Sequence, residues 1–282
     1  MKTVYLNGDF LPADEAKVSV FDRGFLLGDG VYEVIPVYQG RCFQLAGHLA
    51  RLSQSLAGVR MENPLSSAAW TTMIETLVAN NGGGDQSVYL QVTRGVAPRD
   101  HVFPVGVEPT AFAMSNPLLA VPDEYKTKGI AAITLPDIRW QNCNIKAITL
   151  LPNSMLRQQA QDQGAQEAIL IRDGHMTEGA ASNAFIVKNG CIFTSPNNQE
   201  VLPGITRELV ISLASQAGIS CVEQEVSESA LRMADEIWVT SSTKEVLPVT
   251  SLDGVTVGTG VPGAVWQQMD ALYQQYKAGL VV

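Results

Sequence analysis

The feature that most constrains the fold of this chain is a change of pattern at residues 116–122, a segment that contains two prolines. Before it, short apolar runs separated by turns predict strands, and two stretches with helical spacing predict helices. After it, apolar strands alternate with amphipathic helices in a different order. We therefore expect two α+β domains, residues 1–117 and 123–282, joined by a linker at 118–122. A chain of 282 residues suits two domains of modest size.

The first expected domain begins with a hairpin over residues 3–12, which turns at Asn7-Gly8. A strand pair over 31–38 and 41–43, helices over 45–58 and 67–80, and strands over 88–93 and 110–114 follow. In the second domain, Ser227 is placed to cap a helix. That domain is expected to hold strands over 130–135, 168–171, 184–187, 191–193, 219–222 and 236–239, and helices over 154–163, 206–217, 228–233 and 264–276.

Charge and composition disfavour several classes of protein. The chain has 28 acidic and 19 basic side chains, a net charge of −9, which argues against a nucleic-acid or anionic-membrane partner. No apolar run approaches the roughly 18–20 residues of a bilayer span. Asp9 interrupts the N-terminal segment before it could form the apolar region of a secretory signal. The four cysteines are far apart and form no CxxC pair, a pattern typical of reduced thiols. We expect a cytoplasmic protein.

Several common functional motifs are absent from the sequence. Gly28-Asp29-Gly30 begins like a dinucleotide-binding loop, but Glu33 replaces the third glycine and a strand pattern follows where a helix is required. The chain contains no P-loop, no HExxH, no zinc-spaced cysteines and no GxSxG. The sequence therefore gives no support for a metal site.

Lys146 is the lysine with the most unusual surroundings, since it lies in an apolar run, residues 143–151, that we expect to form a strand. Burying an ammonium is costly, which favours the neutral amine. A neutral lysine amine is the nucleophile that forms Schiff bases. The alternative is a lysine at a strand edge whose ammonium reaches water.

Two loops of the second domain have the composition of phosphate sites. Residues 202–207 place Gly204 at the start of a helix, where free N–H groups bind anions, although Thr206 could serve only as a helix cap. Residues 240–243 are four hydroxyl residues after a strand, which are alternatively a polar turn. Arg51 lies at the margin of an apolar helical stripe, one turn after His48, and is either a phosphate ligand or a surface arginine.

Taken in order along the chain, these segments resemble the class IV (fold type IV) pyridoxal-phosphate aminotransferases, and within them the group that acts on D-amino acids. Each motif is weak alone, but their order and spacing are specific. The resemblance covers essentially the whole chain. Its segments are 21–24, 28–33, 48–52, 145–146, 177–179, 182–183, 202–207 and 240–242.

The resemblance implies a small N-terminal α/β domain, a larger C-terminal domain with a mixed β core, and bound pyridoxal 5'-phosphate. It implies that Lys146 carries the cofactor as an internal aldimine and that Glu178, in a turn-like stretch, faces the pyridine nitrogen. Leu202 would pack against the ring. The residues implied to hold the phosphate are Arg51, Ile205, Thr206, Ser241 and Ser242.

Arg99 and His101 are the residues that indicate the subgroup acting on D-amino acids within this resemblance. They are two residues apart, so in an extended segment both would point the same way. The resemblance implies that this pair, reaching in from the neighbouring subunit of a homodimer, binds the substrate α-carboxylate together with Tyr32, and that Tyr89 lines the pocket. Without the resemblance, the pair is interpreted as an exposed charged loop. Ala180-Ala181 departs from the serines often found there.

The implied reaction is ping-pong transamination between a D-amino acid such as D-alanine and a 2-oxo acid such as 2-oxoglutarate, with Lys146 as both covalent anchor and proton carrier. Two alternatives share the fold: an aminodeoxychorismate lyase and an (R)-amine transaminase. A third is a non-catalytic protein that binds a phosphate ligand through the same loops.

Overall fold

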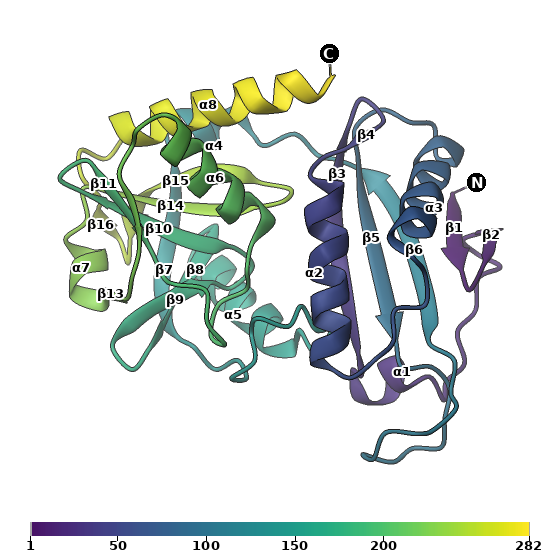
Figure 1. Cartoon of the computed structure of the whole chain (residues 1–282). Helices are drawn as coiled ribbons and strands as arrows, with labels where there is room; N and C mark the ends of the chain where they lie inside the picture. Colours follow the sequence, from purple (N-terminus) through teal and green to yellow (C-terminus); the bar gives the residue numbers. More distant parts are fainter. Residues whose placement is uncertain (1, 282) are drawn as a thin grey trace. The chain divides into compact units, whose positions relative to one another are not determined.

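The computed structural model describes residues 2–281 and divides into two compact units, each with its own sheet (Figure 1). The first unit contains residues 2–119 and 145–149, and the second contains 120–144 and 150–280. The short segment 145–149, which carries Lys146, thus belongs with the first unit although the chain around it belongs with the second. Among the described residues, no helix combines the length and apolar character that a bilayer crossing requires.

The first unit is an antiparallel sheet with two helices on one face. Its strand order is β2-β1-β6-β5-β3-β4, where the strands are β1 (Thr3–Leu6), β2 (Asp9–Pro12), β3 (Gly30–Tyr38), β4 (Arg41–Cys42), β5 (Gln86–Thr93) and β6 (Thr110–Pro117). The two helices on this face are α2 (Leu45–Gly58) and α3 (Ser67–Asn80), and a short helix, α1 (Arg23–Leu27), precedes β3. Alternate residues of β3, such as Val31 and Ile35, join Leu52 of α2 and Trp70 of α3 in one core.

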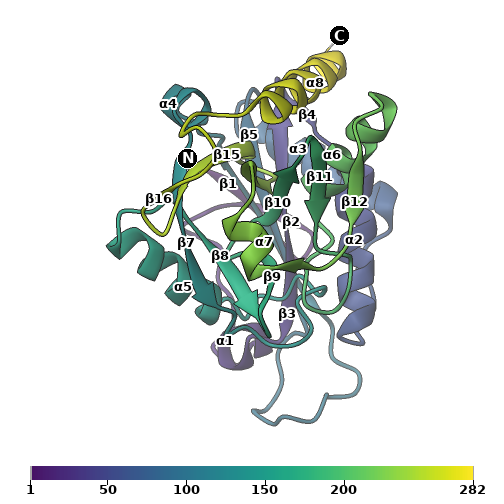
Figure 2. The same cartoon turned by 90° about the vertical axis from the view of Figure 1, so that its left-hand side faces the viewer.

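The second unit is built on a mixed sheet in the order β12-β11-β10-β14-β15-β7-β8-β9-β13, with β16 paired to β15. The pairs β11/β12, β15/β7 and β7/β8 are parallel, and the adjacent strands β7, β8 and β9 can be followed in Figure 2. The strands are β7 (Ile130–Pro136), β8 (Glu167–Arg172), β9 (His175–Gly179), β10 (Asn183–Lys188), β11 (Cys191–Thr194), β12 (Cys221–Glu223), β13 (Val226–Ser227), β14 (Glu236–Ser241), β15 (Glu245–Leu252) and β16 (Val255–Thr256).

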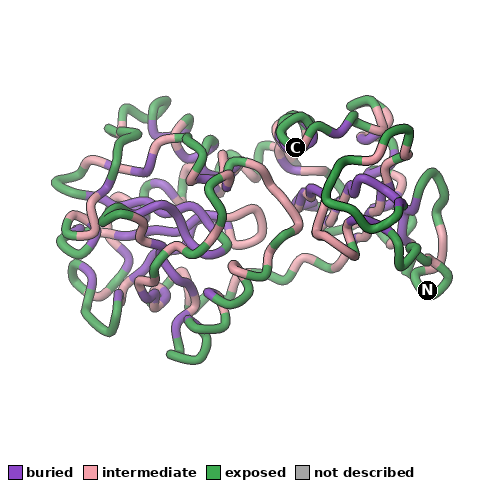
Figure 3. The backbone as a smooth tube through the Cα atoms, turned by 90° about the horizontal axis from the view of Figure 1, so that it is seen from below, coloured by how far each residue is buried: buried purple, intermediate pink, exposed green. Residues whose placement is uncertain are grey.

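Helices pack against this second sheet, and two hydrophobic cores lie against it among the described residues. The helices are α4 (Asp123–Thr127), α5 (Leu151–Asp162), α6 (Ile205–Gln216), α7 (Glu228–Arg232) and α8 (Ala264–Val281). Leu156 of α5 packs with Leu170 of β8 in one core, whereas Ile169, the adjacent strand residue, belongs to the other core. Because side chains of β8 are buried on both faces, its residues 168–171 form a continuous apolar run. Figure 3 shows buried backbone concentrated in the interior of each unit.

Local signals in the sequence predict many of these elements. The turn at Asn7-Gly8 is confirmed, with both residues at positive φ, and Ser227 caps α7 by accepting a hydrogen bond from the Ala230 N–H. The mixed α and β composition is also confirmed, and each unit has its own sheet. The sequence patterns do not predict α1, α4, β9, β13, β15 and β16.

Two local predictions are wrong. Residues 143–150 do not form a strand but turns and bends, with one isolated bridge between Ala147 and Val31. Their apolar character has another cause, because Ile145 packs against the core of the first unit. Glu178 lies on strand β9 and not in a turn-like stretch, since the turn is confined to Asp173-Gly174 just before that strand.

Candidate functional site

Lys146 lies along the open edge of β3 in the first unit. The Tyr32 N–H donates to the Lys146 carbonyl oxygen at 2.9 Å, and the Ile148 N–H donates to the Gly30 carbonyl oxygen at 3.0 Å. The Lys146 N–H donates to Ser55 Oγ at 3.2 Å. The side chain is half-buried, and its Nζ stands 4.1 Å from the centroid of the Tyr32 ring. The ring face therefore limits where the amine can point.

Tyr89, the predicted pocket residue, lies beside Tyr32 on the neighbouring strand. The two rings are stacked, with centroids 5.6 Å apart, and Tyr89 Oη donates to Gln91 Oε1 at 2.7 Å. Burial raises the pKa of Tyr89 to about 12, so its phenol stays protonated at neutral pH. The structure thus brings Lys146, Tyr32 and Tyr89 together.

Glu33, His48 and Arg51 form a buried ionic cluster between β3 and α2. Arg51 donates through Nε and Nη2 to the two oxygens of Glu33, each at 2.7 Å, and His48 Nδ1 lies 2.8 Å from Glu33 Oε2. The three residues are 0%, 1% and 4% exposed in the order Glu33, His48 and Arg51. Burial by itself raises the pKa of Glu33, but the charge and hydrogen bonds of Arg51 outweigh it and lower this pKa to about 2.

The cluster changes the interpretation of Arg51. This arginine is buried rather than at the surface, and Glu33 holds two of its three guanidinium nitrogens, so its orientation is set before any ligand arrives. In the sequence, Glu33 stands out only as the residue that breaks a glycine motif. The usable signal was the spacing: Glu33 shares the core-facing side of β3 with Val31 and Ile35, and His48 and Arg51 share one face of α2.

In the second unit, Glu178 is buried at the end of β9 and accepts three hydrogen bonds. Arg139 Nη1 donates to its Oε1. Asn183 Nδ2 and the Leu202 N–H donate to its Oε2, at 2.9 and 3.1 Å. Burial raises the pKa of Glu178, and Arg139 only partly opposes this effect. A carboxyl whose pKa is raised in this way is suited to share a proton with a neighbouring base.

Arg139 is shared between two carboxylates. Its Nε and Nη2 donate to the two oxygens of Asp137, at 2.9 and 2.8 Å. Thr177 Oγ1 and Arg172 also contact Asp137 Oδ2, at 2.9 and 3.1 Å. Burial disfavours the charged form of Arg139, but hydrogen bonds to Asp137 and the charge of Glu178 raise its pKa above its ordinary value. Asp137 lies two residues before Arg139 in the sequence, whereas the fold brings Glu178 to it from a distant segment.

Asn183 connects the other predicted residues of the second unit. It pairs with Thr240 across β10 and β14, and its Nδ2 donates to the Leu202 carbonyl oxygen at 2.8 Å. A Cβ at Gly204 would lie 1.8 Å from Asn183 Oδ1, so only glycine fits there. Glu178, Leu202, Gly204 and Thr240 therefore surround one amide. The sequence places Asn183 in the 182–183 motif but gives no sign of this function.

The two predicted phosphate loops have donors that suit an anion. Gly204 caps α6 without a side-chain hydrogen bond, which leaves N–H groups of the first turn, at Ile205 and Thr206, available. Helix α6 packs against β14, which ends at Ser241. Within the described part of the chain, the buried Thr240 hydroxyl has no hydrogen-bond partner. Ser242 follows in the turn after β14. A phosphate monoester fits this set of hydroxyl and amide donors.

Arg99 and His101 lie in an irregular segment, residues 97–109, with bends at both positions. The expectation of an extended segment is therefore wrong, since Pro98, Pro104 and Pro109 lack the N–H groups that a strand needs. Both side chains are exposed, as binding residues for a soluble anion must be.

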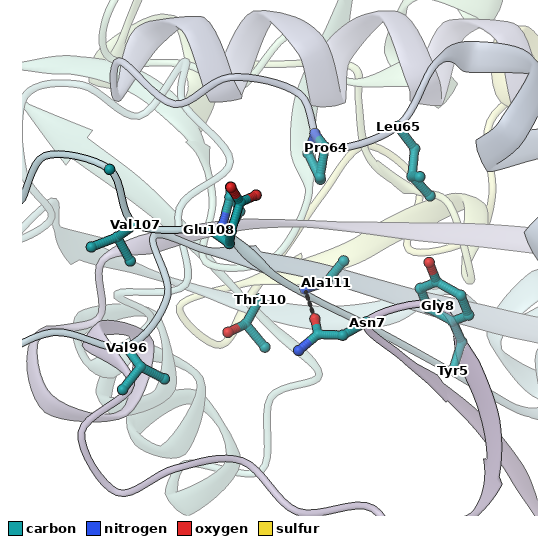
Figure 4. A pocket seen from close by; sticks show the side chains of 12 residues that line it. Tyr5, Asn7, Gly8, Pro64, Leu65, Val96, Val107, Glu108, Thr110 and Ala111 are labelled. Carbon is teal, nitrogen blue, oxygen red and sulfur yellow. Dashed lines mark hydrogen bonds between the residues drawn. The ribbon is translucent and has the colours of Figure 1, made fainter.

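A pocket of about 640 Å³ in the first unit lies apart from all these side chains (Figure 4). It is lined by Tyr5, Pro64, Leu65, Val107 and others, and it adjoins the C-terminal end of the 97–109 segment. None of the predicted site residues lines it. The pocket thus does not define the candidate site.

Comparison with known protein families identifies the family of the chain that carries these clusters. The family model described as amino-transferase class IV matches residues 30–252, which include the Lys146, Glu33 and Glu178 clusters. The chain belongs to this family. It is therefore an aminotransferase, and the fold and family expected from the sequence are confirmed.

Individual relatives of this class IV aminotransferase agree with that assignment. It is 42% identical over 271 residues to a protein named D-alanine aminotransferase from Bacillus licheniformis, covering 96% of this chain and 95% of the relative. A protein of the same name from Staphylococcus haemolyticus is 36% identical over 277 residues, with 98% of each chain covered. The expected D-amino acid subgroup is thus supported by the names of these relatives.

A solved structure of another aminotransferase has the same fold. The branched-chain amino acid aminotransferase of Escherichia coli aligns with a TM-score of 0.91 and 27% identity, covering 97% of this chain and 94% of that chain. A further branched-chain amino acid aminotransferase, solved with pyridoxamine 5'-phosphate, also has a TM-score of 0.91, with 26% identity and coverage of 99% and 95%. The two-unit architecture is therefore that of fold type IV aminotransferases.

Proposed function

We propose that this class IV aminotransferase transfers the amino group of a D-amino acid, such as D-alanine, to a 2-oxo acid such as 2-oxoglutarate, and that Lys146 holds its pyridoxal 5'-phosphate. The observation that carries the proposal is the half-buried Lys146 amine over the Tyr32 ring, on a chain similar along its length to proteins named D-alanine aminotransferase. The lyase and (R)-amine alternatives are not favoured, because those relatives bear neither name.

Bound pyridoxal phosphate supplies an aldehyde that takes up amino groups and a ring that withdraws electrons from the substrate Cα. Lys146 Nζ is the covalent attachment point. Lys146 Nζ would also take the proton from the substrate Cα and return it to the bound cofactor. The Tyr32 ring limits where Nζ can move during these transfers.

The remaining predicted residues of this group would bind the cofactor and orient its ring. Glu178 would hold a proton at the pyridine nitrogen, for which a raised carboxyl pKa is suited. Leu202 would pack against the ring, and its own N–H helps to fix Glu178. Arg51, positioned by Glu33, would neutralise the phosphate. The phosphate would also bind Ile205, Thr206, Ser241 and Ser242.

Arg99, His101 and Tyr32 would bind the substrate carboxylate, with the first two reaching in from the second subunit of a homodimer, and Tyr89 would line the pocket. An exposed apolar surface in the first unit supports the dimer. A monomer rarely exposes so many large apolar side chains in two short segments. The exposed residues are Val18, Val20, Phe21, Phe25, Val102, Phe103 and Val105.

The test uses the purified protein saturated with pyridoxal phosphate. Hydride reduction followed by peptide mass spectrometry should find the phosphopyridoxyl mass on Lys146, and Lys146→Ala should remove both this adduct and the visible absorption band. The matched control is Lys128→Ala, which removes an exposed lysine paired with Glu124. D-alanine with 2-oxoglutarate should yield pyruvate and glutamate in equal amounts. An unmodified Lys146 in the reduced protein would refute its assignment.

A further inference from the structure

The predicted carboxylate-binding residues Arg99 and His101 need a fixed position. They lie on the exposed segment 97–109, which contains neither helix nor strand. A binding loop that must first be ordered loses affinity, because the entropy of ordering opposes binding. The contacts that hold this segment therefore decide how well the two cations can act.

The two ends of the segment are joined beneath it. Asp22 caps α1, and its Oδ2 accepts hydrogen bonds from Thr93 at 3.0 Å and Thr110 at 2.7 Å, residues on the strands before and after the segment. Gly95 has φ +96°, and a Cβ there would lie 2.0 Å from the Glu108 carbonyl oxygen. The ends thus approach each other too closely for any residue but glycine at this position.

A buried ion cluster reaches from these ends into the segment itself. Asp29 Oδ2 accepts from Arg23 Nε and from Arg94 Nε, both at 2.8 Å, and the two arginine side chains are almost fully buried. Arg23 Nη1 donates to the Asp100 carbonyl oxygen at 2.6 Å. The Arg94 guanidinium carbon stands 3.7 Å from the centroid of the Phe103 ring. We call Arg23, Asp29 and Arg94, with these two contacts, the Asp29 clamp.

We infer that the Asp29 clamp is a positioning device that holds Arg99 and His101 where they meet a substrate carboxylate. The inference rests on the proposed function, which gives these two cations that substrate. Asp100 lies between them in sequence, so the hydrogen bond to its carbonyl fixes the backbone at the centre of the pair. Phe103 follows His101 by two residues and fixes the segment beyond it.

The charges of the Asp29 clamp keep it intact at neutral pH. Burial raises the pKa of Asp29, but hydrogen bonds and charges from Arg94 and Arg23 outweigh it and hold this pKa below its ordinary value. The carboxylate therefore stays ionised at neutral pH and keeps both arginines in place. The Gly28-Asp29-Gly30 segment, which resembles a dinucleotide-binding loop in sequence only, thus supplies the carboxylate that holds Arg23 and Arg94.

The first test compares Phe103→Leu with Phe103→Tyr in the cofactor-loaded enzyme. Leucine removes the aromatic face under Arg94, whereas tyrosine keeps it. Phe103→Leu should raise the KM for D-alanine by about three- to thirtyfold, the size of a cation–π contact, and leave kcat and the cofactor absorption band within about twofold of the unchanged enzyme. Hydrogen exchange of amides 97–106 should accelerate. Phe103→Tyr should restore both KM and exchange, and Lys128→Ala, at an exposed site outside the segment, should alter neither.

A second variant breaks a different contact of the Asp29 clamp, so that an effect peculiar to position 103 can be recognised. Arg23→Lys keeps the charge beside Asp29 but removes the guanidinium nitrogen that binds the Asp100 carbonyl, and it should also raise KM and exchange. If Arg99→Ala raises KM while Phe103→Leu and Arg23→Lys change neither KM nor exchange, the clamp inference is wrong and the carboxylate site stands. If Arg99→Ala leaves KM unchanged, the proposed carboxylate site itself fails.

Discussion

Glu33 in the first unit and Glu178 in the second are both fully buried carboxyl groups, yet their acidities are shifted in opposite directions. Glu33 accepts two hydrogen bonds from Arg51 in a bidentate pair, with His48 as a further partner, and its pKa falls to about 2. Glu178 shares Arg139 with Asp137, and burial raises its pKa. The difference shows that burial alone does not set the charge of a carboxyl group. The charges and hydrogen bonds of neighbouring groups oppose burial, and their strength decides the direction of the shift.

The two arrangements also suit different tasks. A carboxylate with a pKa near 2 does not exchange protons at neutral pH, so Glu33 serves to hold Arg51. A carboxyl with a raised pKa is closer to proton exchange, as a partner of a pyridine nitrogen should be. Substitutions at the two carboxyl groups and their partners test whether this contrast is real.

Glu33→Gln is expected to have the largest effect. It leaves the Arg51 guanidinium buried without its counter-charge, which should lower the free energy of unfolding by about 3–5 kcal/mol. Urea unfolding at pH 7 measures this loss. Glu62→Gln, at an exposed position near the end of α2, is the control and should change stability little. A loss below about 1 kcal/mol for Glu33→Gln would mean that the pair does not depend on charge.

Glu178→Gln should act on catalysis more than on stability. Losing the carboxyl that we propose to hold a proton at the cofactor should lower kcat with D-alanine by about a hundredfold or more. Arg139 keeps Asp137 as its partner, so we expect the free energy of unfolding to change by only about 1 kcal/mol. Stopped-flow absorbance gives the rate and urea unfolding gives the stability. A stability loss equal to that of Glu33→Gln would remove the contrast between the two carboxyl groups.

The pH dependence of stability should differ in sign between the two sites. The folded-state pKa of Glu33 lies below its ordinary 4.5, so its stabilising contribution is complete above that pH and is lost as pH falls toward 2. The folded-state pKa of Glu178 is raised, so its charge opposes folding increasingly as pH rises above its ordinary value.

Urea unfolding between pH 3 and pH 8 would reveal this difference. The stability gap between the unchanged protein and Glu33→Gln should shrink at acidic pH. Glu178→Gln should instead gain stability relative to the unchanged protein as the pH rises. Parallel pH profiles for the two variants would show that both carboxyl groups titrate alike.

His48→Gln is expected to have the smallest effect. Burial lowers the pKa of His48 despite the neighbouring Glu33, so the imidazole is neutral at pH 7 and donates an uncharged hydrogen bond. A glutamine amide can donate in its place, and the loss of stability should be about 1 kcal/mol. Arg51→Gln removes a charge from the same carboxylate and should cost several times more. Equal losses for the two variants would indicate that His48 is charged.

Local sequence signals predicted those parts of this protein that depend on neighbours in the chain. Asn7-Gly8 gives a hairpin because both residues tolerate positive φ. Residues 67–80 form a helix as expected, and Ser66 caps it by accepting the Ala69 N–H. The motif order was sufficient to name the family, and the matched family model supports that assignment.

Only the tertiary structure decided how the chemically important side chains are paired. The path of the chain returns residues 145–149 to the edge of β3, which places Lys146 over Tyr32 without a strand. Glu178 receives its partners from β10 and from the loops at Arg139 and Leu202, segments that no periodic pattern relates. Periodicity reports which face of an element is buried, whereas a charge or a pKa depends on atoms that distant segments contribute.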